Sequence, residues 1–134
     1  MKKEAQMLGK KIVVVDDDES IRKTFFLILN KHYRVYLAKD GQEVLDRFKN
    51  ADIDLIIADY KLPSQSGVEL VAEMRKKGYK GDVILISAHP DMIEPDVLSR
   101  LSISCFFAKP LDLTALSRSI DYLLTAREQA ERHV

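Results

Sequence analysis

Cysteine and histidine are scarce in this sequence. Cys105 is the one cysteine among 134 residues, so no internal disulfide can form, and its apolar neighbours indicate a structural thiol in a reducing compartment. Neither His32 nor His89 has a second histidine, a cysteine or a carboxylate at the spacing of a metal site. The sequence therefore argues against disulfide chemistry and against a transition-metal centre.

Net charge and long apolar segments are lacking as well. The 21 basic and 21 acidic side chains cancel, so no overall electrostatic field favours nucleic acid. No apolar run approaches the length that crosses a bilayer, and residues 1–10 are too polar for a secretory signal. We therefore expect a cytoplasmic protein that binds neither nucleic acid nor membrane directly.

Length and composition indicate one globular domain. A chain of 134 residues can form one good core but hardly two, and 46% hydrophobic with 31% charged residues is ordinary for a folded protein. We expect an N-terminal extension over residues 1–10, a single domain over 11–126, and a C-terminal helix end or tail over 127–134.

Short apolar runs alternate with segments of helical periodicity. The runs predict parallel strands that are buried on both faces, and the segments after them carry capping residues and apolar residues at helical spacing. The predicted strands are residues 11–15, 33–38, 54–58, 83–86 and 105–108. The predicted helices begin at Asp18 or Ser20, within residues 40–43, at Val68, near Pro95 and near Asp112.

Three details of the helices can be predicted. Pro95 lies inside residues 91–101, so this helix should begin near the proline, be kinked or be short. The first and last helices should each bury an apolar stripe. The expected buried residues are Ile21, Phe25, Ile28, Leu29 and His32 in the first helix and Leu113, Leu116, Ile120 and Leu124 in the last.

Alternating strands and helices predict an α/β fold, a doubly wound parallel sheet of five strands with five helices on both faces. Such folds bind ligands outside the carboxyl ends of the strands, at the point where the strand order reverses. The residues that follow the predicted strands are therefore the candidates for a functional site.

Charged or polar groups stand at the ends of four predicted strands. They are Asp16 with Asp17, Asp59, Ser87 and Lys109. If the first and third strands are neighbours, three carboxylates converge. Two such charges about 4 Å apart repel by roughly 4 kcal/mol at an effective dielectric of about 20, so a divalent cation would stabilise them. Oxygen ligands suit Mg²⁺, and an added ammonium and hydroxyl complete the groups needed to accept and hold a phosphoryl group.

Each of these residues, taken alone, has an ordinary structural explanation. Asp16, Asp17 and Ser87 can cap helices, and Asp59 can begin a turn. Lys109 can be a solvated surface charge. These explanations do not account for all five residues at the same end of adjacent strands, so the joint site is the stronger hypothesis.

The ordered set of motifs resembles the CheY-like receiver domain of bacterial two-component response regulators. The similarity covers about Lys11 to Leu124, and the spacing of the motifs also resembles that of the family. The motifs are VVVDD at 13–17, Asp59 followed by KLP at 61–63 and by Gly67, SA at 87–88, and FAKP at 107–110. The resemblance implies a flavodoxin-like fold with strand order 2-1-3-4-5.

The resemblance also implies roles for the strand-end residues. Asp59 would be the phosphoacceptor. Asp17 and Asp59 would bind Mg²⁺ directly and Asp16 more often through water, with a backbone carbonyl from Lys61. Lys109 would pair with the phosphoryl group, and its peptide bond to the following proline is expected to be cis.

Further positions are implied to act in switching and in phosphate lifetime. Ser87 would turn toward the phosphoryl group, and Phe107 occupies the position where family members rotate an aromatic ring inward. A phenylalanine there lacks a tyrosine hydroxyl. Lys61 and His89 stand two residues beyond Asp59 and Ser87, where side chains in this family influence how long the phosphate survives.

The implied partners follow from the family. The phosphoryl group would come from a sensor histidine kinase or a histidine phosphotransfer protein. The face formed by the 91–101 helix, the 105–108 strand and the last helix would change, control a downstream effector domain or protein, and could form a homodimer. The domain would be a signalling phosphoacceptor that catalyses only its own phosphorylation and dephosphorylation.

Three alternatives compete with this hypothesis. In a haloacid-dehalogenase-like phosphatase Asp16 would be the nucleophile, but a later acidic pair and a cap insertion are lacking, and Asp59 would have no role. A flavodoxin-like flavin binder is disfavoured because the acidic residues at 18–19 would repel a flavin phosphate. A receiver-like adaptor that works without phosphorylation is the third alternative.

Overall fold

The centre of the computed structural model, which describes residues 9–48 and 52–132, is a five-stranded parallel sheet. Its strand order, β2-β1-β3-β4-β5, confirms the expected order. β1, β3 and β4 are almost wholly buried because helices cover both faces, whereas β2 and β5 form the edges. The strands are β1 (Lys11–Val15), β2 (Arg34–Ala38), β3 (Leu55–Asp59), β4 (Asp82–Ser87) and β5 (Cys105–Ala108).

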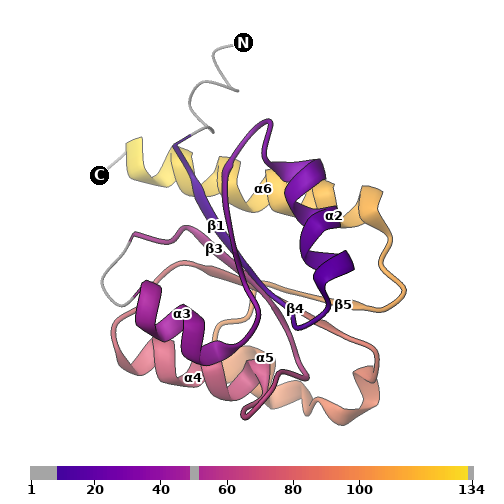
Figure 1. Ribbon diagram of the computed structural model, residues 1–134. Helices are drawn as coiled ribbons and strands as arrows, with labels where there is room; N and C mark the ends of the chain where they lie inside the picture. Colours follow the sequence, from indigo (N-terminus) through magenta and orange to yellow (C-terminus); the bar gives the residue numbers. More distant parts are fainter. Residues whose placement is uncertain (1–8, 49–51, 133–134) are drawn as a thin grey trace.

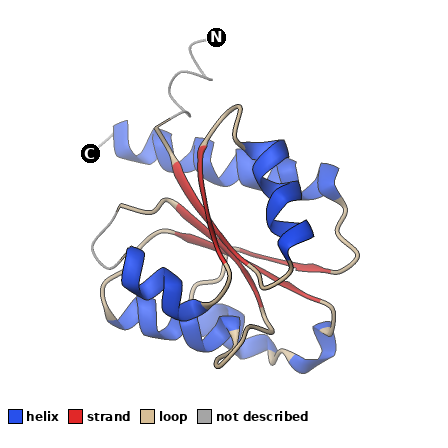
Figure 2. Ribbon diagram, viewed as in Figure 1, coloured by secondary structure: helices blue, strands red, loops and turns tan. Residues whose placement is uncertain are grey.

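Helices form a layer on each side of the sheet, as Figures 1 and 2 show. On one side lie α2 (Glu19–Leu29) and α6 (Leu113–Arg132). On the other lie α3 (Gly41–Arg47), α4 (Gly67–Lys76) and α5 (Pro95–Arg100). A 3₁₀-helix, η1 (Pro90–Met92), precedes α5. Within the described residues the five predicted α-helices are therefore present, on both faces of the sheet.

Alternate residues of the central strands fill two separate cores. Ile12 and Ile57 point to the side of α2 and α6, while Val13 and Ile56 point to the side of α3 and α4. All four are fully buried, and each such side chain stabilises the fold by about 1.5–3 kcal/mol. The carboxyl ends of β1 and β3 are consequently held in a fixed relative position.

Local side-chain hydrogen bonds begin the helices where the sequence predicts. Ser66 and Glu69 form a reciprocal capping box at the start of α4, and Gly78, with φ of +96°, follows its end. Asp40 caps α3 by accepting from the backbone of Glu43. The Glu43 carboxylate accepts from the N–H of residue 39 instead of that of Asp40, so the start of α3 lacks the reciprocal hydrogen bond of a capping box.

Two residues that were predicted to be buried are exposed in the structure. His32 is exposed because α2 ends at Leu29, and Tyr33 occupies the buried place and donates its hydroxyl to Asp121. Leu113 is 39% exposed because it is the first residue of α6, one turn before the helix packs on the sheet. The helix at the proline is short and begins at Pro95, as predicted.

An ionic cluster lies at the amino ends of the strands. Lys10 is only 6% exposed, and its ammonium contacts Glu131, lies 2.9 Å from Glu128 and 3.9 Å from Asp54. Arg127 adds a 3.2 Å contact to Asp54. The start of β1 is thereby tied to the last turns of α6.

The helix α6 continues through Arg132, so most of the segment predicted as a helix end or tail is helical. Residues 133–134, and residues 1–8 of the predicted extension, lie outside the described residues. None of the described helices has the length and apolar character needed to span a bilayer.

Candidate functional site

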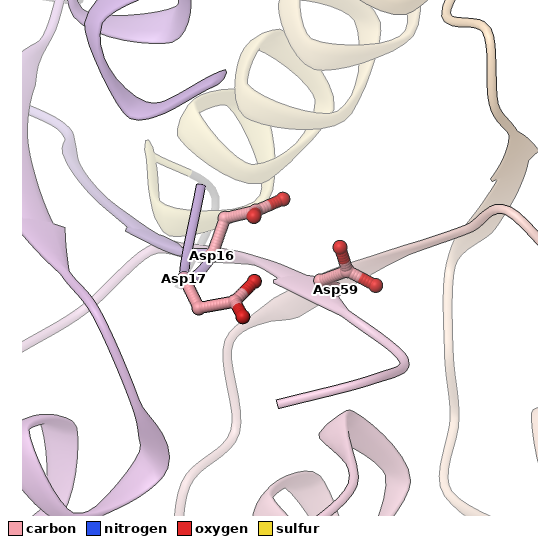
Figure 3. A group of neighbouring side chains, drawn as sticks. All are labelled: Asp16, Asp17 and Asp59. Carbon is pink, nitrogen blue, oxygen red and sulfur yellow. The ribbon is translucent and has the colours of Figure 1, made fainter. Parts of the chain in front are cut away.

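Three carboxylates meet where β1 and β3 end. Val15 pairs with Ala58 across these strands, so Asp16, Asp17 and Asp59 follow at the same edge of the sheet. One carboxylate oxygen from each lies within 4.8 Å of the others, and Figure 3 shows the three groups side by side. Asp16 is fully buried, Asp59 is 5% exposed and Asp17 is exposed. The predicted convergence is therefore present.

Backbone and side-chain donors orient the buried carboxylates. Asp16 accepts at Oδ1 from the N–H of Asp18, 2.9 Å away, and Asp59 accepts at Oδ1 from the N–H of Lys61, 3.0 Å away. The guanidinium of Arg22 donates to the backbone carbonyl of Asp16 at 2.6 Å. These bonds leave the other oxygen of each carboxylate to face Lys109.

The ammonium group of Lys109 joins the acidic cluster from the end of β5. Its Nζ lies 2.5 Å from Oδ2 of Asp59 and 3.4 Å from Oδ2 of Asp16. Burial alone would lower the pKa of Lys109, but the hydrogen bond to Asp59 and the charges of both carboxylates raise it overall. The expected cis peptide bond between Lys109 and Pro110 is present. Lys109 is therefore a fixed cation within the site.

Burial raises the pKa of Asp16 to about 6, and the charge of Asp59 adds to the increase. The Asp18 N–H and the Lys109 ammonium act in the opposite direction without cancelling it. One lysine thus leaves the three carboxylates short of positive charge. Their all-oxygen donor set fits a hard divalent cation such as Mg²⁺.

A cavity of about 380 Å³ opens onto the site. It brings together the predicted phosphoacceptor, three of the four residues predicted to bind the metal, the hydroxyl, the ammonium and both positions assigned to phosphate lifetime. Its lining residues are Asp17, Asp59, Lys61, Leu62, Pro63, Ser87, Ala88, His89 and Lys109. Asp16 lies next to them but is wholly buried.

The two predicted switch residues lie on neighbouring strands. Ser87 ends β4, is 2% exposed, and accepts at Oγ from the N–H of His89, 2.9 Å away. Phe107 lies on β5, opposite Ile86 of β4. Its side chain is half-buried and packs on the core beneath α2 and α6. Their roles in switching stay predictions.

Two supporting features are visible only in three dimensions. A Cβ atom on Gly67 would lie 2.3 Å from the backbone oxygen of Asp59, so the start of α4 approaches this strand end as only glycine allows. Gly67 belonged to the motif, but no local pattern showed what it touches. The contact of Arg22 with the Asp16 carbonyl could not be predicted from the sequence, since an arginine in the first turns of a helix is ordinary.

Comparison with known proteins identifies the family. The family model for the response regulator receiver domain matches residues 12–121. The chain belongs to this family. Response regulator RR06 of Streptococcus pneumoniae serotype 2 is 35% identical over 114 residues. The match covers 84% of this receiver domain and 52% of that relative, so the chain spans about half the relative's length.

Solved structures agree with this assignment. The response regulator TrrA of Thermotoga maritima, in complex with Mg²⁺-BeF, is 30% identical with a TM-score of 0.74, covering 86% of this chain and 99% of that one. A CheY-like receiver domain of Methanospirillum hungatei is 25% identical with a TM-score of 0.80, covering 90% and 98%. The predicted family and the predicted flavodoxin-like fold of this receiver domain are confirmed.

Proposed function

We propose that this receiver domain accepts a phosphoryl group on Asp59 from the phosphohistidine of a sensor histidine kinase or a histidine phosphotransfer protein. An Asp59 oxygen would bond to phosphorus as the phosphorus–nitrogen bond breaks, and the imidazole would leave with the bonding electrons. The observation that carries the proposal is that Asp59, Ser87 and Lys109 line one cavity beside two further carboxylates.

Asp59 is better placed than Asp16 to be the nucleophile. Asp59 lines the cavity and keeps 8% of its side chain exposed, whereas the Asp16 side chain has no exposed surface. One carboxylate oxygen of Asp16 also accepts a hydrogen bond from the N–H of Asp18. A phosphodonor can therefore reach Asp59 without a rearrangement of β1.

Asp16, Asp17 and Asp59, with the backbone carbonyl of Lys61, are the groups that would hold Mg²⁺. When bound, the ion would neutralise the carboxylates and screen the charge of an incoming phosphoryl group. The complex of TrrA with Mg²⁺-BeF supports this assignment. The Lys109 ammonium, already 2.5 Å from Asp59, would move to a phosphoryl oxygen, and the Ser87 hydroxyl would donate to another.

Phosphorylation would act as a switch by favouring one of two states of the α5, β5 and α6 face. That face would then control an effector domain or protein, or form a homodimer. The domain would be a signal carrier that catalyses only its own phosphorylation and dephosphorylation. A cytoplasmic location, and a function for Lys61 and His89 in phosphate lifetime, stay predictions.

The proposal is tested by incubating the chain with Mg²⁺ and acetyl phosphate and measuring the intact mass. The wild type should gain one phosphoryl group, and neither Asp59→Asn nor wild type in excess EDTA should gain any. A gain that persists in Asp59→Asn and vanishes in Asp16→Asn would support the phosphatase alternative. No gain in the wild type would support the adaptor.

A further inference from the structure

Arg75, in the last turn of α4, holds together two segments outside its own helix. Its guanidinium donates to four backbone carbonyl oxygens at distances of 2.9–3.1 Å. Two acceptors, Tyr79 and Gly81, belong to the turn between α4 and β4, and two, Leu101 and Ser102, directly follow α5. We call these four hydrogen bonds the Arg75 clamp.

The C-terminal end of α5 depends on this clamp because the helix itself is weakly held. It has six residues, none of them buried, and no side-chain cap at its start. Leu98 and Ile103 pack only partly against the core. The chain after the clamp is attached to β4. The N–H of Ser104, the residue before β5, donates to the carbonyl of Val83 in β4.

The approach to the N-terminal end of α5 is held by a different group. The N–H of His89 donates to the Ser87 hydroxyl oxygen, and from there the chain runs through η1 with short-range bonds from Met92 to His89 and from Ile93 to Pro90. A movement of the Ser87 hydroxyl would break the bond to His89. It would leave the Arg75 clamp untouched.

We propose that Arg75 is a positioning residue that keeps the C-terminal end of α5 fixed, so that a change at Ser87 moves only the N-terminal side of this segment. The inference rests on the proposed function, in which phosphorylation of Asp59 draws the Ser87 hydroxyl. A guanidinium suits the task, because its planar fork of donors satisfies several carbonyls that a lysine could not reach together. The helix would then turn about its C-terminal end.

Amide hydrogen exchange of the full unphosphorylated chain tests the two attachments separately. Arg75→Gln should accelerate exchange at residues 101–104 about tenfold and leave residues 89–93 unchanged, since each lost hydrogen bond weakens a local structure. Ser87→Ala should do the reverse. Lys77→Gln is the matched control, because Lys77 is exposed at the end of the same helix and its ammonium lies 3.3 Å from Glu73 of that helix.

Arg75→Lys is a second variant that separates loss of the clamp from general unfolding. It keeps the positive charge, so it should accelerate amide exchange at residues 101–104 less than Arg75→Gln does. A uniform acceleration over the whole chain in both Arg75 variants would overturn the proposal, because it would show a general loss of stability. Unchanged exchange at residues 101–104 would overturn it as well.

Phosphorylation provides the second arm of the experiment. In the wild type the exchange changes caused by Mg²⁺ and acetyl phosphate should stop before Leu101, and in Arg75→Gln they should extend through Ser104. Changes that already reach Ser104 in the wild type would contradict the fixed end. If the wild type gains no phosphoryl group, the proposed function fails, while the unphosphorylated comparison still decides whether the two ends are held independently.

Discussion

The Lys109 ammonium lies 2.5 Å from Oδ2 of Asp59, so the proposed nucleophile is already paired with the cation that would contact its phosphoryl group. This contact orients the Asp59 carboxylate before any donor arrives. It also places a positive charge in direct competition with Mg²⁺ for carboxylate oxygens. Lys109 is therefore expected to have opposite effects on metal binding and on retention of the phosphoryl group.

Lys109→Met should bind Mg²⁺ about tenfold more tightly than the wild type, because a competing cation is removed from the cluster and solvent screens only part of its effect. Titration calorimetry measures the affinity. Lys23→Met, which alters an exposed pair with Glu19 on α2, should leave the affinity unchanged. Equal or weaker binding in Lys109→Met would contradict the competition.

Asp16→Asn should stabilise the metal-free protein at neutral pH. Folding raises the pKa of Asp16 from 3.8 to about 6, so the folded state binds the proton more tightly and the free energy of unfolding falls as pH rises between these values. The variant lacks this penalty, and should be about 1–3 kcal/mol more stable at pH 7.5 with no gain below pH 4.

Denaturant unfolding in EDTA at several pH values measures this difference. Asp17→Asn is the matched control, because Asp17 is exposed and keeps its hydration, so its substitution should change stability less. A constant difference between Asp16→Asn and the wild type from pH 4 to 7.5 would disprove the account of the buried carboxylate.

Much of the site could be predicted because strand ends are local features. An apolar run followed by Asp16 or Asp59 reveals where a strand stops, and parallel strands bring these stops to one edge. Lys10 could not be predicted, since its partners Glu128 and Glu131 come from the far end of the chain. His32 was misplaced because helical periodicity continues past the true end of α2.

Gly67→Ala should destabilise the protein by about 1–3 kcal/mol, because its Cβ would meet the rigid backbone oxygen of Asp59 at 2.3 Å. Gly41→Ala is a matched comparison. Its Cβ would meet the end of the Gln65 side chain, which can move aside, so the cost should be smaller. Thermal unfolding ranks the two variants, and a larger loss in Gly41→Ala would refute the argument from close approach.

Lys10→Met should lower the free energy of unfolding by about 1 kcal/mol, because it removes a nearly buried ammonium from a cluster with Asp54, Glu128 and Glu131, whose carboxylates are half-buried or exposed. The affinity for Mg²⁺ should stay at the wild-type value, since this cluster lies at the opposite end of β1 from Asp16. Unfolding and calorimetry on the same sample test both statements. A weaker Mg²⁺ affinity would show that the two ends of the sheet are coupled.

Chemical trapping of the phosphorylated residue tests the central claim most directly. Borohydride reduces an acyl phosphate to an alcohol, so an aspartyl phosphate becomes homoserine and can be located by tandem mass spectrometry. After treatment with Mg²⁺ and acetyl phosphate, homoserine should be found at position 59 and at no other aspartate. Homoserine at position 16, or a phosphorylated protein with none at position 59, would contradict the assignment of Asp59 as the phosphoacceptor.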